Sequence, residues 1–100
     1  MARLGPIPCT ITVYRLDDPD PDVSYLDQPG FEERKQQYED GVFTFIGIRA
    51  IGVCGEITVF SGGLWGIESD SDEEYLTRIG DDEAEDVRRI LRDHGIQFVE

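Results

Sequence analysis

The run from Val42 to Cys54 constrains the fold of this chain more than any other stretch of the sequence. It is rich in β-branched and aromatic residues, which is typical of a long β-strand. Both faces of such a strand would carry apolar groups: Val42, Ile46, Ile48 and Ala50 on one, Phe43, Phe45, Ile51 and Val53 on the other. Gly47 and Gly52 indicate a bend, a bulge or the close approach of a helix.

Shorter segments with strand character flank this run. Residues 9–14 alternate Cys9, Ile11 and Val13 with Thr and Tyr, the pattern of a half-buried strand. A hairpin turn at Gly55 and Glu56 leads to residues 57–60, and a break at 61–63 precedes residues 64–67. We therefore predict an antiparallel meander, to which residues 96–99 could add a closing edge strand.

The segment between the first strand and the long run predicts irregular structure and one short helix. Residues 17–22 hold two prolines and four carboxylates, which indicates an exposed loop. A turn is expected at residues 25–30. Residues 31–40 predict a helix with a thin apolar stripe, and Gly41 is a good stop signal for it.

The last third of the chain predicts a long helix. Ser71 followed by Glu74 matches a capping box at its start, and Gly95 closes it. Gly80 predicts a kink or two shorter helices, because glycine costs about 1 kcal/mol relative to alanine in a helix interior. Apolar residues and the single histidine recur close to the helical period, so most can share one face. These residues are Leu76, Ile79, Val87, Ile90, Leu91 and His94.

Together these segments give the order β-α-β-β-β-α-β. We expect one α+β domain over residues 1–100, a mainly antiparallel sheet with the long C-terminal helix packed on one face. The residues expected in a single core are Ile46, Ile48, Val53, Val59, Leu76, Val87 and Ile90.

Composition bounds the compartment and the ligands. Cys9 and Cys54 lie far apart in apolar stretches, so we expect two buried thiols rather than a disulfide. No apolar run approaches the roughly 20 residues that span a bilayer, and residues 1–8 lack a signal core, so we expect a cytoplasmic protein. The chain has 22 acidic and nine basic side chains, a net charge of −13. This charge argues against binding nucleic acid or an anionic membrane, because Lys and Arg must neutralise phosphates.

Carboxylates are densest between positions 68 and 86, where ten acidic residues accompany a single arginine, Arg78. Two interpretations stay open. A solvated helix face explains the acids near the helix start, where the macrodipole favours them. It explains the later ones poorly, because like charges four residues apart repel. The alternative is a DNA mimic that occupies a basic groove. On that interpretation the partner-binding residues are Trp65, Glu68, Asp70, Asp72, Glu73, Asp81, Asp82, Glu85 and Asp86.

Metal binding and catalysis receive less support. The acidic loops that begin at Asp18 and Asp70 place acids at alternate positions, as calcium loops do, but both lack glycine at the sixth position. We therefore expect weak cation binding at most, and no metal site. His94 is the only histidine, no phosphate-binding loop is present, and the paired carboxylates lack an apolar pocket. We expect no enzyme and no cofactor.

Trp65 lies between glycines and just before the acidic stretch. It can be a core or cap residue whose indole N–H meets a carbonyl, or an exposed anchor at a binding surface. The segment from Gly63 to Leu76, followed by an acidic helix, resembles a group of small uncharacterised acidic proteins of actinobacterial phages and prophages. The Asp-Pro-Asp stretch near Pro19 and the segment from Tyr38 to Phe43 are also similar.

This resemblance implies a phage or prophage origin and no particular activity. Small acidic phage proteins often block host defence or DNA-handling enzymes, which favours the mimic by analogy. We therefore expect a non-enzymatic binding protein that engages a basic, nucleic-acid-binding surface of a host protein in the host cytoplasm. The alternatives are an accessory protein with a merely solvated acidic helix and a weak carboxylate-loop cation binder.

Overall fold

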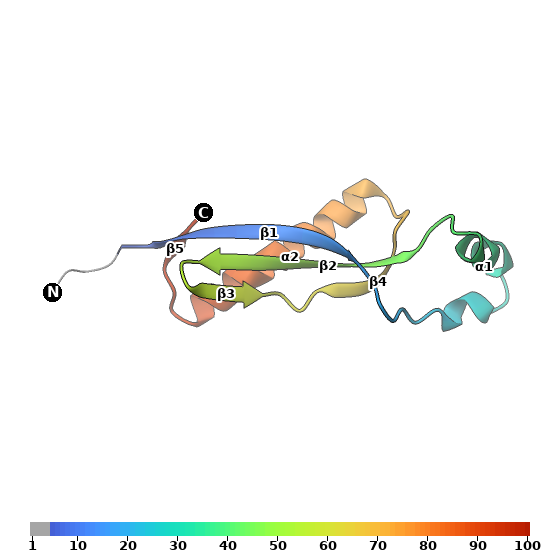
Figure 1. The fold of residues 1–100 in the computed structure, drawn as a ribbon, viewed down its shortest axis with the longest axis horizontal. Coiled ribbons are helices and arrows are strands. Elements are labelled where there is room, and N and C mark those ends of the chain that lie inside the picture. Colours follow the sequence, from blue (N-terminus) through green and yellow to red (C-terminus); the bar gives the residue numbers. More distant parts are fainter. Residues whose placement is uncertain (1–4) are drawn as a thin grey trace.

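A computed structural model describes residues 5–100 as an α+β fold in which one long helix lies across a sheet (Figure 1). This confirms the predicted fold class and the long C-terminal helix. The elements in chain order are β1 (Ile7–Asp17), the 3-10 helix η1 (Ser24–Asp27), α1 (Glu32–Glu39), β2 (Phe45–Cys54), β3 (Ile57–Phe60), β4 (Leu64–Glu68), α2 (Glu73–Asp93) and β5 (Phe98–Val99).

The sheet has the order β3-β2-β1-β5, with β5 parallel to β1 and the other pairs antiparallel. The predicted meander is wrong at its last strand, because β4 pairs with β2 and not with β3. The reason is length: four-residue β3 covers β2 only at Ile51–Cys54, which leaves the start of β2 for the next segment. β4 therefore continues along the same edge of β2, with a register shift between Ile46 and Ile48.

α2 covers one face of the sheet and leaves the other face open. Two clusters join the helix to the sheet. At the C-terminal half of α2, Ala84, Val87 and Leu91 pack on Cys9, Ala50 and Cys54. At its N-terminal half, Leu76 and Ile79 pack on Ile48 and Ile67. The predicted single core is therefore divided into clusters. The assignment of Val53 to that core is wrong, because Val53 is 48% exposed on the open face. Alternation along β2 places it opposite to its buried neighbours Gly52 and Cys54.

Two glycines bring α2 close to the sheet. A Cβ atom on Gly52 would lie 2.7 Å from Val87 Cγ1, and one on Gly80 would lie 2.9 Å from Val13 Cγ1. The helix approach expected at Gly52 is thus confirmed. The kink expected at Gly80 is wrong, because α2 is continuous from Glu73 to Asp93. Gly80 is instead a contact point between the helix and β1, at which a Cβ atom would force the Val13 side chain to shift.

The ends of α2 differ from the prediction. The capping box is wrong: Ser71 Oγ donates to the Glu68 carbonyl oxygen at 2.6 Å, and Asp72 is the N-cap, accepting from the Glu74 N–H at 3.4 Å. Aspartate caps as well as serine does, so two adjacent candidates hid the register of the helix start. His94 is the exposed C-cap residue and does not share the buried face.

The expectation of two separate thiols is wrong, because Cys9 and Cys54 form a disulfide. The two residues are 45 positions apart but lie directly opposite in the antiparallel β1–β2 register, with a Cα–Cα distance of 4.2 Å. Disulfides form mainly in oxidising compartments, so the two cysteines do not support the predicted cytoplasmic location.

Residues 18–43 form a distal lobe at the end of the sheet remote from β5 (Figure 1). The principal extents of the molecule are 67 × 21 × 18 Å, and its radius of gyration is 18.0 Å. A compact chain of 100 residues would have a radius of gyration of about 13 Å, so the protein is a rod. The predicted helix at 31–40 is confirmed as α1. Val42 and Phe43, the first two residues of the long run, belong to the lobe rather than to β2, and Phe43 packs with Leu26 and Phe45.

Candidate functional site: the acidic surface

The nine residues predicted to bind a partner do not form one surface. Trp65 lies in β4, Glu68 ends that strand, Asp70 and Asp72 lie in the connection, and the remaining five lie on α2. The Trp65 ring covers Gly47, where a Cβ atom would meet a ring carbon at 2.0 Å. Gly47 points away from α2 because its neighbour Ile48 packs against that helix. Trp65 and the acids of α2 therefore lie on opposite sides of the sheet.

Trp65 combines features of both interpretations made from the sequence. Its indole N–H points at the Gly62 carbonyl oxygen at 3.4 Å, as expected of a cap, while 40% of the residue is exposed. The ring seals Gly47 and still presents one face to solvent. It can thus contact a partner on the open face of the sheet, but not together with Asp81 or Asp82.

One arginine of α1 holds the two acids nearest the lobe. Arg34 Nε donates to Glu68 at 2.8 Å, and its Nη1 donates to Asp70 at 2.9 Å. These hydrogen bonds hold the pKa of the Asp70 carboxyl below its usual value. The Tyr25 hydroxyl also donates to Glu68, at 3.2 Å. Burial of the phenol, with the nearby Glu68 carboxylate, raises the pKa of Tyr25 to about 12.

Three further predicted acids are also held by the chain's own arginines. Arg15 on β1 binds Glu73 with two hydrogen bonds, one of them at 3.0 Å, and lowers the pKa of that carboxyl. Hydrogen bonds from Arg92, at 3.0 Å, and from Arg88, at 3.3 Å, lower the pKa of Glu85. Asp86 accepts from Arg89. The C-terminal half of α2 is therefore largely neutralised from within.

Asp72, Asp81 and Asp82 differ from these. In the part of the chain that the structure describes, no Lys or Arg nitrogen lies within 4.0 Å of their carboxylate oxygens. Asp72 serves as the N-cap, whereas Asp81 and Asp82 are exposed in the middle of α2. These two carboxylates are the predicted site residues that the fold itself does not employ.

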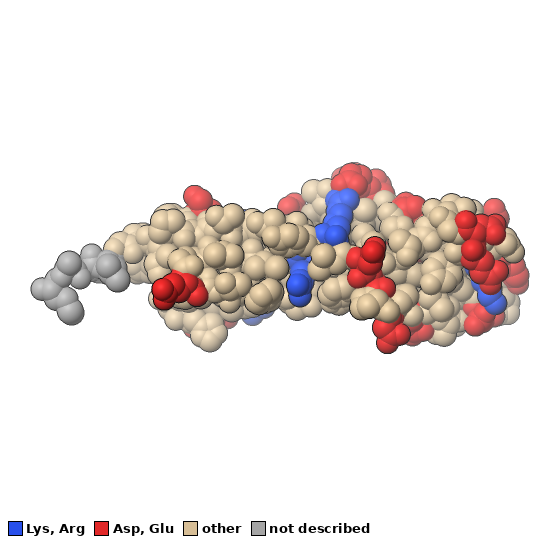
Figure 2. Space-filling view, in the orientation of Figure 1, with Lys and Arg blue, Asp and Glu red and all other residues tan. Residues whose placement is uncertain are grey.

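The distal lobe is a second acidic region, of which the sequence analysis recognised only the loop at residues 17–22. Residues 18–43 carry eight carboxylates against Arg34 and Lys35. Figure 2 shows acidic side chains gathered at this end of the rod, whereas the open face over β1, β2 and β3 is almost free of them. The alternation along β1 predicted the face that carries Thr10, Thr12 and Tyr14, but the pattern of one strand does not show whether another segment covers that face.

The Asp-rich loop has a structural role. Asp18 accepts from the N–H of Asp20 at 3.0 Å and from the N–H of Gly66 at 2.9 Å, which ties the loop to β4. Asp22 accepts from the N–H and the hydroxyl of Ser24, the first residue of η1. Within residues 5–100, no group of three His, Cys, Asp or Glu side chains is placed to hold a metal ion.

Among the described helices, none combines the length and the apolar character that crossing a membrane requires. Comparisons with protein-family models, with curated proteins and with solved structures found no match to this chain.

Proposed function

We propose that this chain is a non-enzymatic binding protein that engages a basic surface of another protein, of the kind that otherwise holds nucleic acid. The observation that carries the proposal is the contrast within α2. Glu85 and Asp86 are satisfied by arginines of the same helix, whereas Asp81 and Asp82 have no basic group within 4.0 Å in the described chain. Asp81 and Asp82 each lie four residues before another acid, Glu85 or Asp86, and like charges at that helical spacing repel. A basic partner would offset that repulsion.

The charge density limits how much nucleic acid such a protein imitates. A net charge of −13 along a 67 Å rod corresponds to about one charge per 5 Å. B-DNA carries one charge per ~1.7 Å of its axis. The proposal is therefore a local basic patch, from which nucleic acid is displaced by competition, rather than a duplex-length groove.

A solvated acidic helix is the second candidate. It is favoured by the C-terminal half of α2, where Arg88, Arg89 and Arg92 already neutralise the acids. The two candidates differ in what Asp81 and Asp82 do, because solvated carboxylates can be neutralised without any effect on binding.

A binding comparison separates them. A partner is captured from host lysate at low salt, and its affinity is measured for the parent, for an Asp81→Asn/Asp82→Asn variant and for a matched Glu85→Gln/Asp86→Asn variant. We expect the first variant to weaken binding severalfold and the second only slightly, with the parent's affinity falling as salt rises. Duplex DNA or RNA should compete for the same partner. Equal binding by all three proteins, or a partner that keeps its nucleic acid when bound, would refute the proposal.

The resemblance of the Trp65 segment to phage proteins supports a phage or prophage origin, and with it the host cytoplasm as the proposed compartment. The Cys9–Cys54 disulfide weighs against this compartment, because disulfides are rare in the cytoplasm, and the redox state of the pair therefore tests it. In a reducing host cytoplasm the bond would be open. Thiol titration of denatured protein, alkylated as the cells are broken, should then find two free cysteines. Finding none would contradict the compartment.

A further inference from the structure

We infer that the outer edge of β1 and the N-terminal half of α2 form a docking groove for an extended segment of a partner protein. The segment would add to the sheet as a further strand, with an apolar and a basic side chain facing α2. This inference rests on the proposed function, since it names the kind of segment by which a basic partner binds. It is carried by the main-chain geometry of β1 and by the cavity beside it.

The main-chain groups of β1 alternate between its two edges. The Asp18 N–H donates to the Phe45 carbonyl oxygen at 3.0 Å, toward β2, and the Ile7 N–H donates to the Gln97 carbonyl oxygen at 2.9 Å, toward β5. In an antiparallel pair, alternate residues bond to the same neighbour, so the odd-numbered residues of β1 direct their N–H and C=O groups to the outer edge. Within residues 5–100, a strand pairs with that edge only at Ile7 and Pro8.

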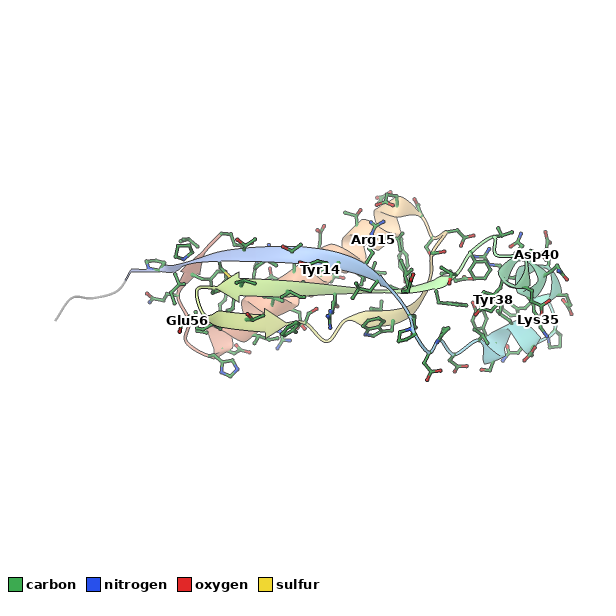
Figure 3. All side chains as sticks on the ribbon, in the orientation of Figure 1. Tyr14, Arg15, Lys35, Tyr38, Asp40 and Glu56 are labelled. Atoms are coloured by element: carbon green, nitrogen blue, oxygen red, sulfur yellow. A yellow bond between two sulfur atoms is a disulfide. The ribbon has the colours of Figure 1, made fainter. Side chains whose placement is uncertain are left out.

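The edge beyond Pro8 is suited to accept a strand. Ile11, Val13 and Arg15 present three N–H and three C=O groups outward, in a register with β2 that runs unbroken from Cys9 to Asp17. Natural edge strands are commonly protected by proline, lysine or a bulge, and this stretch has none of the three. Its one basic side chain, Arg15, which is labelled in Figure 3, is held by Glu73.

The helix continues past this edge. In Figure 1 the N-terminal half of α2 projects beyond β1 on the side away from β2. A cavity of about 320 Å³ lies beneath it, lined by Val13, Arg15, Leu76, Thr77, Gly80 and Asp81. Val13 is 41% exposed although Gly80 touches it. The fold thus has a helix positioned over a place where the sheet lacks a strand.

The lining of the cavity indicates which side chains the added strand would carry. Val13 from β1 and Leu76 and Gly80 from α2 form the apolar part of the lining. Asp81 adds a carboxylate with no Lys or Arg nitrogen within 4.0 Å in the described chain. Arg15 at the other end is already neutralised by Glu73. An apolar residue over Val13 and a Lys or Arg two residues away would complement both. Strand addition of this kind draws affinity from main-chain hydrogen bonds and specificity from alternate side chains.

A second copy of this chain fits the groove poorly. Pairing of β1 with its own copy about Val13 would bring two α2 helices to the same space, because Gly80 lies directly on Val13. It would also place Asp81 and Asp82 of both copies together, in a protein with a net charge of −13. Charge complementarity therefore favours a basic segment over self-association.

Amide hydrogen exchange of the isolated protein tests the edge itself. At low concentration we expect the N–H groups of Ile11, Val13 and Arg15 to exchange fast, and those of Thr10, Thr12 and Tyr14 to be protected by β2. Protection of all six that disappears on dilution, together with a dimer in sedimentation, would mean that a second copy covers the edge and would overturn the inference.

A designed peptide tests the occupant. The probe is acetyl-Lys-Thr-Val-Thr-Lys-Thr-Val-amide, compared with a version with Glu in place of Lys and with a version N-methylated at alternate residues. We expect the Lys peptide to bind and to slow the exchange of the Ile11, Val13 and Arg15 amides. The Glu peptide should bind more weakly. N-methylation that removes two inward N–H groups should weaken binding at least about tenfold, at about 1 kcal/mol for each hydrogen bond.

Two protein variants give the matched comparison. Asp81→Asn should weaken binding of the Lys peptide about two- to fivefold, the range of an exposed ion pair, whereas Asp82→Asn, outside the cavity, should leave it unchanged. Thr77→Phe, at an exposed position, should fill the cavity and abolish binding without affecting the fold.

The outcomes distinguish this inference from the proposed function. Binding that depends on Lys but is unaffected by N-methylation would overturn strand addition and leave the acidic binding surface standing. Equal binding of the Lys and Glu peptides, both blocked by N-methylation, would keep the edge site and remove the basic partner. No binding of any peptide at millimolar concentration would overturn the inference.

Discussion

The sheet with α2, which we call the body, and the distal lobe are stabilised by different interactions. In the body, α2 presents a continuous buried stripe that includes Leu76, Val87 and Leu91, and packs it directly on the sheet. In the lobe, α1 has no buried residue. The lobe is built around aromatic rings. Tyr38, which is labelled on α1 in Figure 3, packs against Phe45 with 5.2 Å between the ring centres.

Arg34 takes the place in α1 that an apolar stripe has in α2. Its guanidinium lies 3.6 Å from the centre of the Phe43 ring and binds both Glu68 and Asp70. Arginine is suited to both contacts, because its planar guanidinium stacks on aromatic rings and its N–H groups bind carboxylates. The comparison teaches that a helix without an amphipathic pattern can still be docked by two side chains, Tyr38 and Arg34, and that part of its docking then depends on charge.

The largest effect is expected in the body. Leu91→Ala removes a fully buried side chain from the cluster under α2. It should lower the free energy of unfolding by about 2–5 kcal/mol, because a leucine cavity in a packed core is only partly refilled. Chemical denaturation followed by circular dichroism measures this. A loss below 1 kcal/mol would show that α2 is not the main support of the body.

Reduction of the Cys9–Cys54 disulfide is the next largest change. The bond closes a loop with a sequence separation of 45, and it also lies within the body. Opening it should lower the free energy of unfolding by about 2–4 kcal/mol, chiefly by releasing the unfolded chain. Thermal unfolding with and without reductant should show the shift, and a Cys9→Ala/Cys54→Ala variant should show none.

A smaller and local effect is expected in the lobe. Arg34→Met keeps the length of the side chain and removes its charge, so the lobe should lose about 1–2 kcal/mol of docking free energy. Exchange of the α1 amides should accelerate while the α2 amides keep their protection. Arg89→Met, at an exposed arginine on α2, is the matched control and should change neither. If α2 exchanged faster as well, the two regions would unfold as one unit.

The smallest effect is a pH dependence confined to the lobe. Hydrogen bonds from Arg34 lower the pKa of Asp70, so the contribution of this pair is complete above the ordinary value, about 3.9. It is lost as the pH falls through the lowered value, because protonation removes the carboxylate. Protection of the α1 amides from exchange should therefore fall below about pH 4, while the α2 amides keep theirs. In Arg34→Met this difference should disappear.

Local patterns carried most of the fold. Alternation identified β1, the β-rich run identified β2, and the helical period from Leu76 onward identified α2, because each pattern reflects how its own residues meet one covered face. The assignments that failed depend on distant partners. Gly80 reads as a helix breaker until Val13 is placed against it, and Val53 reads as core until α2 is seen to lie on the other face.

The candidate site divides in the same way. Counting charges found the acidic stretch of α2, but it could not separate Asp81 and Asp82 from Glu85 and Asp86. That distinction depends on where the arginines reach, and long flexible side chains do not reveal their partners in the sequence. The open face of the sheet and the outer edge of β1 were not predicted, because they exist only where no other segment packs on the sheet or pairs with the strand.

The sequence by itself determined the elements, their order, the fold class and the net charge, since these follow from short-range periodicity and composition. Only the tertiary structure decided which acids are neutralised and that Cys9 bonds to Cys54. It also decided that β3 and β4 pair with the same edge of β2, and that the outer edge of β1 lies beneath the N-terminal half of α2. The physical reason is the range of the interactions. Propensity and burial pattern reflect neighbours in the chain. Pairing across 45 residues depends on the register of whole strands, and a register shift of one residue would move every side chain of a strand to the other face.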